Sequence, residues 1–326
     1  MRYGYKASSE QFAARPLLEY SLLAERLGFD TVAVADHFQP WRHHGGQAPF
    51  ALSWLGALAQ ASERILIGTS VLTPTLRYQP AVVAQAFATL GSLAPGRVFL
   101  GVGTGEAMNE IPAIGGAWPG GRERRRRLEE AVALIRRLWS EERVDFEGDY
   151  FTVVRATIYE RPPEPVPIWI AAGGPLAAKL AGRAGDGFIC TSGKGEDLYH
   201  ELLAAVAEGA GGRELTNMIE IKVSYDTDRQ AAEDACRWWG ALALSGEQKS
   251  SIHDPVEMER AADAQAEKAS SRFIVSDDPD EVVEKVAFYA ELGFTELVFH
   301  HPGDDQARAL ELFARDVLPR LRERLG

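Results

Sequence analysis

Three side chains suited to acid–base chemistry follow the apolar run TVAVA within one short stretch of chain. Asp36 offers a carboxylate, His37 an imidazole and Trp41 an indole, and a second acid, Glu106, ends the run VFLGVGTGE. An imidazole changes charge near neutral pH, so it can take or give a proton during a reaction. A histidine at a strand end is also commonly a hydrogen-bonded structural residue, and these residues alone leave both interpretations open.

Two glycine-rich segments could bring bare backbone close to a flat or phosphorylated ligand. Gly103-Thr104-Gly105 precedes Glu106, with Asn109 shortly after it, and Ala172-Gly173-Gly174 follows the run PIWIA. Taken alone, each segment is better explained as a tight turn between a strand and a helix. The run GVGTGE also lacks the third glycine of a dinucleotide-binding turn, so that motif is weak.

Three cations and a hydroxyl are candidates for binding a phosphate group. Thr191 and Lys194 lie in GFICTSGKGE, among glycines that free backbone N–H groups, while Lys249 lies in GEQKSSI and Arg272 in SSRFIV. Such donors bind phosphate well. Judged by spacing alone, each cation fits a solvated surface position, so a phosphate site depends on the fold bringing them together.

The histidine and cysteine patterns do not indicate a metal site. His43-His44 and His300-His301 are adjacent pairs, whose side chains point to opposite faces of a strand, and no acid or cysteine stands at ligand spacing. Cys190 and Cys236 are far apart and form no CxxC pattern. We expect no metal, no disulfide framework, and a location in the reducing cytoplasm.

The candidate residues stand at the ends of short apolar runs that alternate with longer helical patterns along the chain. This alternation is typical of parallel strands joined by crossover helices. The helical patterns include residues 16–28, 80–93, 175–185 and 279–293, several of which open with proline and close with glycine. The eight strand candidates begin near Arg2, Thr31, Ile65, Val98, Pro167, Gly187, Met218 and Glu296.

Eight βα units over 326 residues predict a closed (β/α)₈ barrel in a single domain, residues 1–326. An open doubly wound sheet would place a GxGxxG turn after its first strand, where none occurs. In a barrel the active site forms at the carboxyl ends of the strands, where the candidate residues stand. Three stretches, about 106–121, 144–166 and 240–271, exceed ordinary loop length and are expected to build the substrate pocket.

The charge balance narrows the choice of partners. A formal net charge of −12 at pH 7 argues against binding to nucleic acid or to an anionic membrane surface. The first residues lack a basic segment followed by an apolar run, and no window of about 18 uninterrupted apolar residues occurs. We expect no nucleic-acid or membrane partner, and any anionic ligand must be met by locally clustered cations.

Longer motifs occur in order from about Gly4 to the C-terminus: GTSVLTPT, FLGVGTGEA, GAWP, GDGFICTSGKGE, MIEIKVSYD and LVFHHPG. Together they resemble the F420-dependent glucose-6-phosphate dehydrogenases of the luciferase-like superfamily. Ordered motifs of this length are far more specific than a glycine pattern. Two features depart from the family: Ser250 stands where relatives commonly carry histidine, and the stretch after Glu110 is one residue shorter.

The resemblance implies a luciferase-like barrel, a homodimer, and the deazaflavin coenzyme F420, which accepts a hydride at its C5 carbon. It also implies a non-prolyl cis peptide between Ser70 and Val71. The cofactor-binding positions that it implies are Asp36, Ser70, Val71, Thr73, Gly103, Thr104, Asn109, Ala172, Gly173 and Gly174.

The implied reaction is hydride transfer from C1 of glucose 6-phosphate to F420, giving 6-phosphogluconolactone. His37, Glu106 and Trp41 would be the catalytic residues, and Glu10 is a second candidate for the proton acceptor. The residues implied to hold the phosphate are Thr191, Lys194, Lys249 and Arg272.

Three other functions remain open at this point. A flavin monooxygenase of the same barrel group would not need the phosphate-binding residues. A dehydrogenase of a lipid or simple alcohol would carry apolar residues in their place. A non-catalytic binding barrel would have no reason to keep His37, Trp41 and Glu106.

Overall fold

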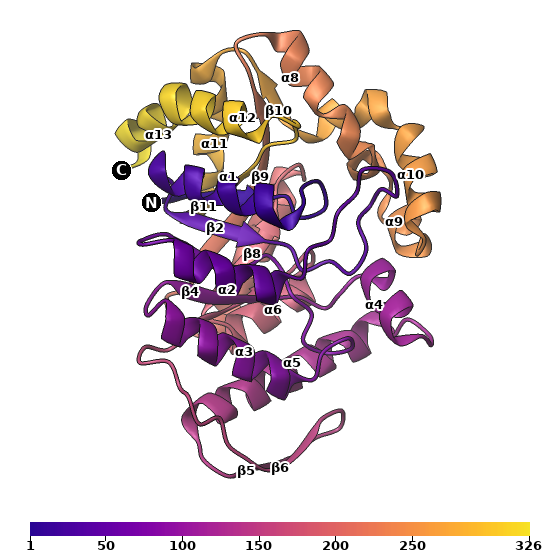
Figure 1. Cartoon of the computed structure of the whole chain (residues 1–326), viewed down its shortest axis with the longest axis vertical. Helices are drawn as coiled ribbons and strands as arrows, with labels where there is room; N and C mark the ends of the chain where they lie inside the picture. Colours follow the sequence, from indigo (N-terminus) through magenta and orange to yellow (C-terminus); the bar gives the residue numbers. More distant parts are fainter.

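The computed structural model describes residues 1–326, and its centre is a ring of eight parallel strands (Figure 1). Pairing between the eighth and ninth strands of the chain closes the ring. This confirms the predicted (β/α)₈ barrel, and each predicted strand start falls within two residues of an observed one. Around the ring, the strands are β1 (Arg2–Ala7), β2 (Thr31–Val34), β3 (Leu66–Thr69), β4 (Val98–Val102), β7 (Ile168–Ala171), β8 (Gly187–Thr191), β9 (Thr216–Tyr225) and β11 (Glu296–His300).

Crossover helices cover the outside of the barrel, and local signals in the sequence fix many of their ends. The helix predicted at residues 279–293 has clear signals at both ends. Pro279 begins it, the Asp278 side chain accepts a hydrogen bond from the Asp280 N–H, and Gly293 ends it with φ of +110°. The covering helices are α1 (Ala14–Arg26), α2 (Ala51–Ala61), α3 (Pro80–Leu93), α5 (Gly121–Ser140), α6 (Pro175–Ala184), α7 (Glu196–Ala210), α11 (Pro279–Leu292), α12 (Gln306–Leu312) and α13 (Leu318–Leu325).

The barrel interior changes from apolar to polar toward the carboxyl ends of the strands. Phe99 and Trp169 stack with ring centroids 4.1 Å apart and belong to a small apolar cluster that also contains Val298. Two residues further along β11, His300 lines a cavity. Because inward side chains recur every second residue, one strand contributes both to the apolar layer and to the polar layer above it.

The three long stretches contain secondary structure of their own. The second stretch forms an antiparallel hairpin that projects from the barrel at the bottom of Figure 1; none of its residues lines the cavity, so the expectation that it helps to build the pocket is wrong. The third stretch forms a group of short helices beside α4. A further short strand, β10, pairs with β9 outside the ring and was not predicted. The elements in these stretches and next to them are α4 (Ala107–Ile114), β5 (Val144–Glu147), β6 (Thr152–Ala156), α8 (Arg229–Ala235), η1 (Arg237–Ala243), α9 (Gly246–Ser251), α10 (Pro255–Asp263), η2 (Ala266–Arg272) and β10 (Ile274–Ser276).

A small second core fixes the third stretch to the first. Met108 of α4 packs with Leu244 and with Met258 of α10, and Trp41 covers this cluster from the loop after β2. The segment that carries Lys249, which lies between Leu244 and Ile252, is therefore held against the loop of His37 and the helix that follows Glu106. None of the helices combines the length and the apolar character that crossing a lipid bilayer requires.

Candidate active site

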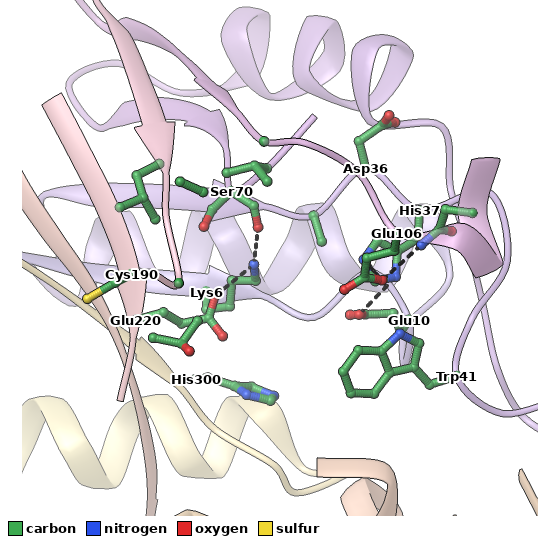
Figure 2. Close-up of a pocket in the computed structure, with 18 of the residues that line it drawn as sticks. Lys6, Glu10, Asp36, His37, Trp41, Ser70, Glu106, Cys190, Glu220 and His300 are labelled. Atoms are coloured by element: carbon green, nitrogen blue, oxygen red, sulfur yellow. Dashed lines mark hydrogen bonds and ion pairs between the residues drawn. The ribbon is translucent and has the colours of Figure 1, made fainter. Parts of the chain in front are cut away.

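A cavity of about 510 Å³ opens at the carboxyl ends of the barrel strands (Figure 2). This volume lies within the usual range of small-molecule sites. Every residue predicted for catalysis, cofactor binding or substrate binding lines the cavity, with the exception of Gly174, which precedes the first turn of α6. The fold thus brings together segments from both ends of the chain.

One wall carries Glu10, His37, Trp41 and Glu106, which we call the histidine cluster. His37 Nδ1 lies 3.0 Å from Glu10 Oε1, and Nε2 lies 3.8 Å from Glu106 Oε2. The first contact is close enough for an ion pair but is poorly aligned for a hydrogen bond. The Trp41 ring is stacked at 6.4 Å from the imidazole, with 25° between the planes. Figure 2 shows the contacts of His37 with both carboxylates, which would stabilise the imidazole after it takes up a proton.

Asn109, in the first turn of α4, positions two parts of this wall. Its Oδ1 accepts hydrogen bonds from the backbone N–H groups of Phe38 (2.8 Å) and Gln39 (3.1 Å), and its Nδ2 donates to Glu106 Oε2 at 3.2 Å. One buried amide therefore ties the loop after β2 to the loop after β4. A single Nδ2 hydrogen remains for a ligand.

Asp36 turns away from His37, so it does not orient the imidazole (Figure 2). Its Oδ2 accepts hydrogen bonds from Arg77 Nη2 at 2.8 Å and from the Tyr78 hydroxyl at 2.9 Å. Burial and the Asp36 carboxylate together raise the pKa of Tyr78, which keeps this hydroxyl protonated as a donor. Asp36 lines the cavity, and its Oδ1 atom is buried and has no hydrogen-bond partner within the protein.

A second wall consists of backbone and short side chains. Val71, Gly103, Ala172 and Gly173 line it, and the Ser70-Val71 peptide bond is cis. A Cβ atom added at Gly103 would come within 2.7 Å of the Val71 Cγ2 atom, so only glycine fits there without a shift. With no long side chain on this wall, the cavity keeps a slot for a flat ring. The slot and the free Asp36 Oδ1 fit a planar heterocycle that bears N–H groups.

Beyond Trp41 the cavity is bordered by Lys194, Lys249 and Arg272, which we call the cation cluster, with Thr191 beside them. None of the three forms an ion pair with a carboxylate: Lys249 Nζ donates to the Leu242 carbonyl at 3.1 Å, and Arg272 Nε is buried without a partner. Burial, and then the nearby Arg272 charge, lower the pKa of Lys249. Uncompensated cations at the edge of a cavity make a site for an anion.

The loop that carries Lys194 is held from below by α7. The Tyr199 hydroxyl accepts a hydrogen bond from the Lys194 backbone N–H at 3.1 Å and donates to the Thr191 carbonyl at 3.2 Å. Gly193 has φ of +81°, a conformation that favours glycine. The loop conformation is therefore fixed by contacts within the protein, and it places Thr191 and Lys194 at the same cavity edge.

Sequence reasoning missed four ionisable residues at the base of the cavity, Lys6, Glu220, Lys222 and His300, which we call the floor residues. Lys6 Nζ lies 2.9 Å from Glu220 Oε2 and donates to the Ser70 carbonyl at 2.5 Å. Burial alone would raise the Glu220 pKa, but Lys6, Lys222 and His300 lower it to about 2. Burial lowers the pKa of His300 to about 3, so its ring is neutral. The sequence offered one signal for these residues: charged side chains stand inside the apolar runs RYGYKA and MIEIKVSY, which are predicted to be buried strands.

Comparison with known proteins places this geometry in context. The family model for luciferase-like monooxygenases matches residues 1–296. The chain is 62% identical to the F420-dependent glucose-6-phosphate dehydrogenase of Beutenbergia cavernae, over 99% of this chain and 98% of that protein. It is 59% identical to the protein of the same name from Mycobacterium tuberculosis, over 100% and 99% of the two chains. A solved F420-dependent secondary alcohol dehydrogenase, in complex with an F420-acetone adduct, superposes with a TM-score of 0.92 at 34% identity, covering 98% of this chain and 99% of that one.

Proposed function

The chain belongs to the luciferase-like monooxygenase family and, within it, to the F420-dependent glucose-6-phosphate dehydrogenases; from this we propose that it moves a hydride from C1 of glucose 6-phosphate to F420. The products are 6-phosphogluconolactone and reduced F420. The observation that carries the proposal is the shared cavity, in which a histidine between two carboxylates adjoins three cations without acidic partners. Trp41 lies between the two groups, with the Lys249 ammonium 5.9 Å from its ring centroid.

F420 supplies a ring carbon, C5, that accepts the hydride. In this chain Val71, Gly103 and Gly173 would lie against the ring, because no side chain on their wall fills the slot. Asp36 Oδ1 would accept a hydrogen bond from a ring N–H. Ser70, Thr73, Thr104, Asn109 and Ala172 border the same slot, and Gly174 follows it at the start of α6.

Oxidation at C1 requires that the anomeric hydroxyl lose its proton as the lactone carbonyl forms. We assign that proton to His37 Nε2, because the Glu10 carboxylate beside Nδ1 favours the tautomer that leaves Nε2 free to accept. Once His37 is protonated, Glu10 stabilises the imidazolium charge. Reduction of F420 takes up one proton in addition to the hydride, and Glu106, next to His37 Nε2, would supply that proton from its carboxyl group.

The 6-phosphate would be bound by Thr191, Lys194, Lys249 and Arg272. A flavin monooxygenase or a dehydrogenase of simple alcohols would not need these cations to bind its substrate, and a non-catalytic barrel would not need the histidine cluster. Charge-assisted hydrogen bonds to a dianion are the strongest polar contacts available to these side chains. The substrate is therefore proposed to span the cavity, with C1 at His37 and the phosphate at the cation cluster.

The test is spectroscopic. The purified protein is mixed with oxidised F420, and the visible absorbance is followed after adding glucose 6-phosphate, glucose, or buffer. Loss of absorbance with the sugar phosphate alone is expected. Equal or faster oxidation of the sugar phosphate with NAD, NADP or FMN in place of F420 would contradict the proposal.

We further propose a homodimer that acts in carbohydrate metabolism in the cytoplasm. Cys190 and Cys236 are buried and unpaired, which suits a reducing compartment, and burial raises the pKa of Cys190 to about 12. The family membership supports the dimer. Light scattering should give twice the mass of the chain, and a mass equal to one chain at micromolar concentration would contradict it.

A further inference from the structure

Lys222 is a buried cation that the proposed reaction does not use. It lies on β9, two residues after Glu220, so both side chains point into the barrel, and it is 5% exposed. Its backbone N–H donates to Ser192 Oγ at 2.9 Å, and its Nζ donates to the Ser192 carbonyl at 3.3 Å. Ser192 belongs to the loop that carries Thr191 and Lys194. The ammonium therefore lies beside this loop and lines the same cavity as the cation cluster.

No carboxylate lies within the 4 Å of an ion pair from this ammonium. The nearest acid along the strand, Glu220, forms its ion pair with Lys6 Nζ at 2.9 Å, and Figure 2 shows this pair beside Ser70. An ammonium has three N–H donors, and the single long contact to Ser192 uses one of them. Burying a charge without a partner is costly, and a methionine or glutamine could fill the same space at lower cost.

The surroundings make this cation still harder to explain without a ligand. Burial lowers the pKa of Lys222 to about 8; Glu220 opposes this change, while the charges of Arg272, Lys194 and Lys249 add to it. These three cations approach from different elements: η2, the loop after β8, and α9. Lys222 comes from strand β9, and all four line one cavity, close enough for the three charges to affect Lys222.

We propose that Lys222 is a further substrate-binding residue, whose ammonium contacts the phosphate of the sugar from the floor of the barrel. The proposal rests on the function proposed above and deepens it, because it assigns the deep side of the phosphate site. It accounts for the free donors, for the missing carboxylate, and for the hydrogen bonds that connect Lys222 to the loop of Thr191 and Lys194.

A dependence on pH follows from the groups that face Lys222. Among them, Glu220 is ionised and His300 neutral throughout the range from pH 7 to 10, and Cys190 has a pKa of about 12. The remaining neighbours are cations: Lys6 of β1, Lys194, Lys249 and Arg272. Without an anion Lys222 loses its proton as pH rises through about 8, whereas a bound dianion would keep it protonated. Affinity for the phosphate dianion should thus be constant between about pH 7 and 8 and fall above pH 8.

The experiment measures binding rather than turnover. Inorganic phosphate and glucose 6-phosphate are titrated by calorimetry into the full-length, cofactor-free protein at pH 7.0 and 8.5, in two buffers that differ in protonation enthalpy. We expect Lys222→Met to weaken phosphate binding by about 10–100-fold at pH 7.0. We also expect the wild type to take up a fraction of a proton per phosphate bound at pH 8.5, and Lys222→Met to take up less.

Three further variants keep the test decisive. Lys222→Arg, the fallback if the methionine variant does not fold, retains a permanent charge, so it should bind phosphate with less dependence on pH. Lys249→Arg removes the other lysine whose pKa is lowered, and the proton uptake should persist in it. Lys285→Met makes the same chemical change on an exposed helix position and should bind phosphate as the wild type does.

Phosphate binding by Lys222→Met within threefold of the wild type would overturn the proposal, as would unchanged proton uptake in Lys222→Arg. This result is separable from the reaction. If glucose 6-phosphate fails to reduce F420 while phosphate binding still depends on Lys222, the proposed function falls and the anion site stands. If the reaction proceeds and Lys222→Met binds phosphate normally, only this inference falls.

Discussion

The histidine cluster and the cation cluster border the same cavity but differ in how their charges are balanced. His37 has a carboxylate within 4 Å of each ring nitrogen, whereas Lys194, Lys249 and Arg272 have none. A proton acceptor works with fixed partners, which must be in place before the substrate arrives. An anion site works with charges left unpaired, because a resident carboxylate would compete with the ligand. The difference predicts that one cluster governs turnover and the other governs binding.

The largest effect is expected from removing the proton-transfer groups. His37→Ala and Glu106→Gln should each lower kcat by about 10²–10⁴-fold, because each group acts on charge that develops in the transition state. The KM for glucose 6-phosphate should change only a few-fold. Steady-state assays with F420 in excess measure both constants.

The control for this pair is Glu19→Gln, which alters an exposed carboxylate of α1 that pairs only with Arg15. Its kinetic constants should match those of the wild type. Turnover near the wild-type rate in both His37→Ala and Glu106→Gln would remove the histidine cluster from the mechanism.

A smaller effect, seen in a different constant, is expected at the cation cluster. Lys194→Ala, Lys249→Ala and Arg272→Ala should each raise the KM for glucose 6-phosphate by about 10–100-fold, since each loses a charge-assisted hydrogen bond to phosphate. Unphosphorylated glucose should be a very poor substrate that the wild type and all three variants use about equally. Lys179→Ala, on the exposed face of α6, is the matched control.

The comparison would fail if the three alanine variants kept the wild-type KM for the phosphate, or if free glucose reacted as well as glucose 6-phosphate. In either case these residues would be ordinary cations near the cavity. The division between a histidine cluster that governs turnover and a cation cluster that governs binding would then have no basis.

The sequence predicts the barrel well because its signals are local. Strand starts such as Thr31 and Val98 are marked by apolar runs, and Pro279 and Gly293 mark the ends of a helix. The third long stretch is different. Its helices α9 and α10 depend on packing between Leu244, Met258 and distant Met108, and no short window of sequence contains that contact.

The site shows the same limit at the level of single residues. Asp36 and His37 are adjacent in sequence, yet Asp36 pairs with Arg77 and Tyr78, and the carboxylate nearest His37 Nδ1 is Glu10 from another loop. Adjacent residues leave a strand on opposite sides, so nearness in sequence is a poor guide to nearness in a pocket. Lys222 was missed for a related reason, since a charge within a strand is usually taken to face solvent.

The two clusters should also differ in how their residues are coupled. Lys249 and Arg272 share one proposed ligand, and the Arg272 charge helps to lower the pKa of Lys249. The double variant Lys249→Ala/Arg272→Ala should therefore raise KM by less than the product of the single effects, by roughly 3–10-fold. His37→Ala combined with Lys249→Ala should give effects that multiply, because the two act on different constants. Simple multiplication in the first pair would show that the two cations do not share a ligand.

The smallest expected effect concerns the folded protein without ligands. Like charges held close together without carboxylates destabilise a folded state, so removing one of them should stabilise it even though binding is lost. Lys249→Met is expected to raise the melting temperature of the ligand-free protein by about 1–2 °C, measured by calorimetry at low ionic strength. Glu10→Gln should give no such gain, because it removes the carboxylate that faces His37. Inorganic phosphate should reverse the order, since it stabilises the wild type by binding and has less effect on Lys249→Met. A lower melting temperature for ligand-free Lys249→Met would mean that this lysine is held by contacts such as its hydrogen bond to Leu242, and that the cation cluster is a part of the packing as much as a site for an anion.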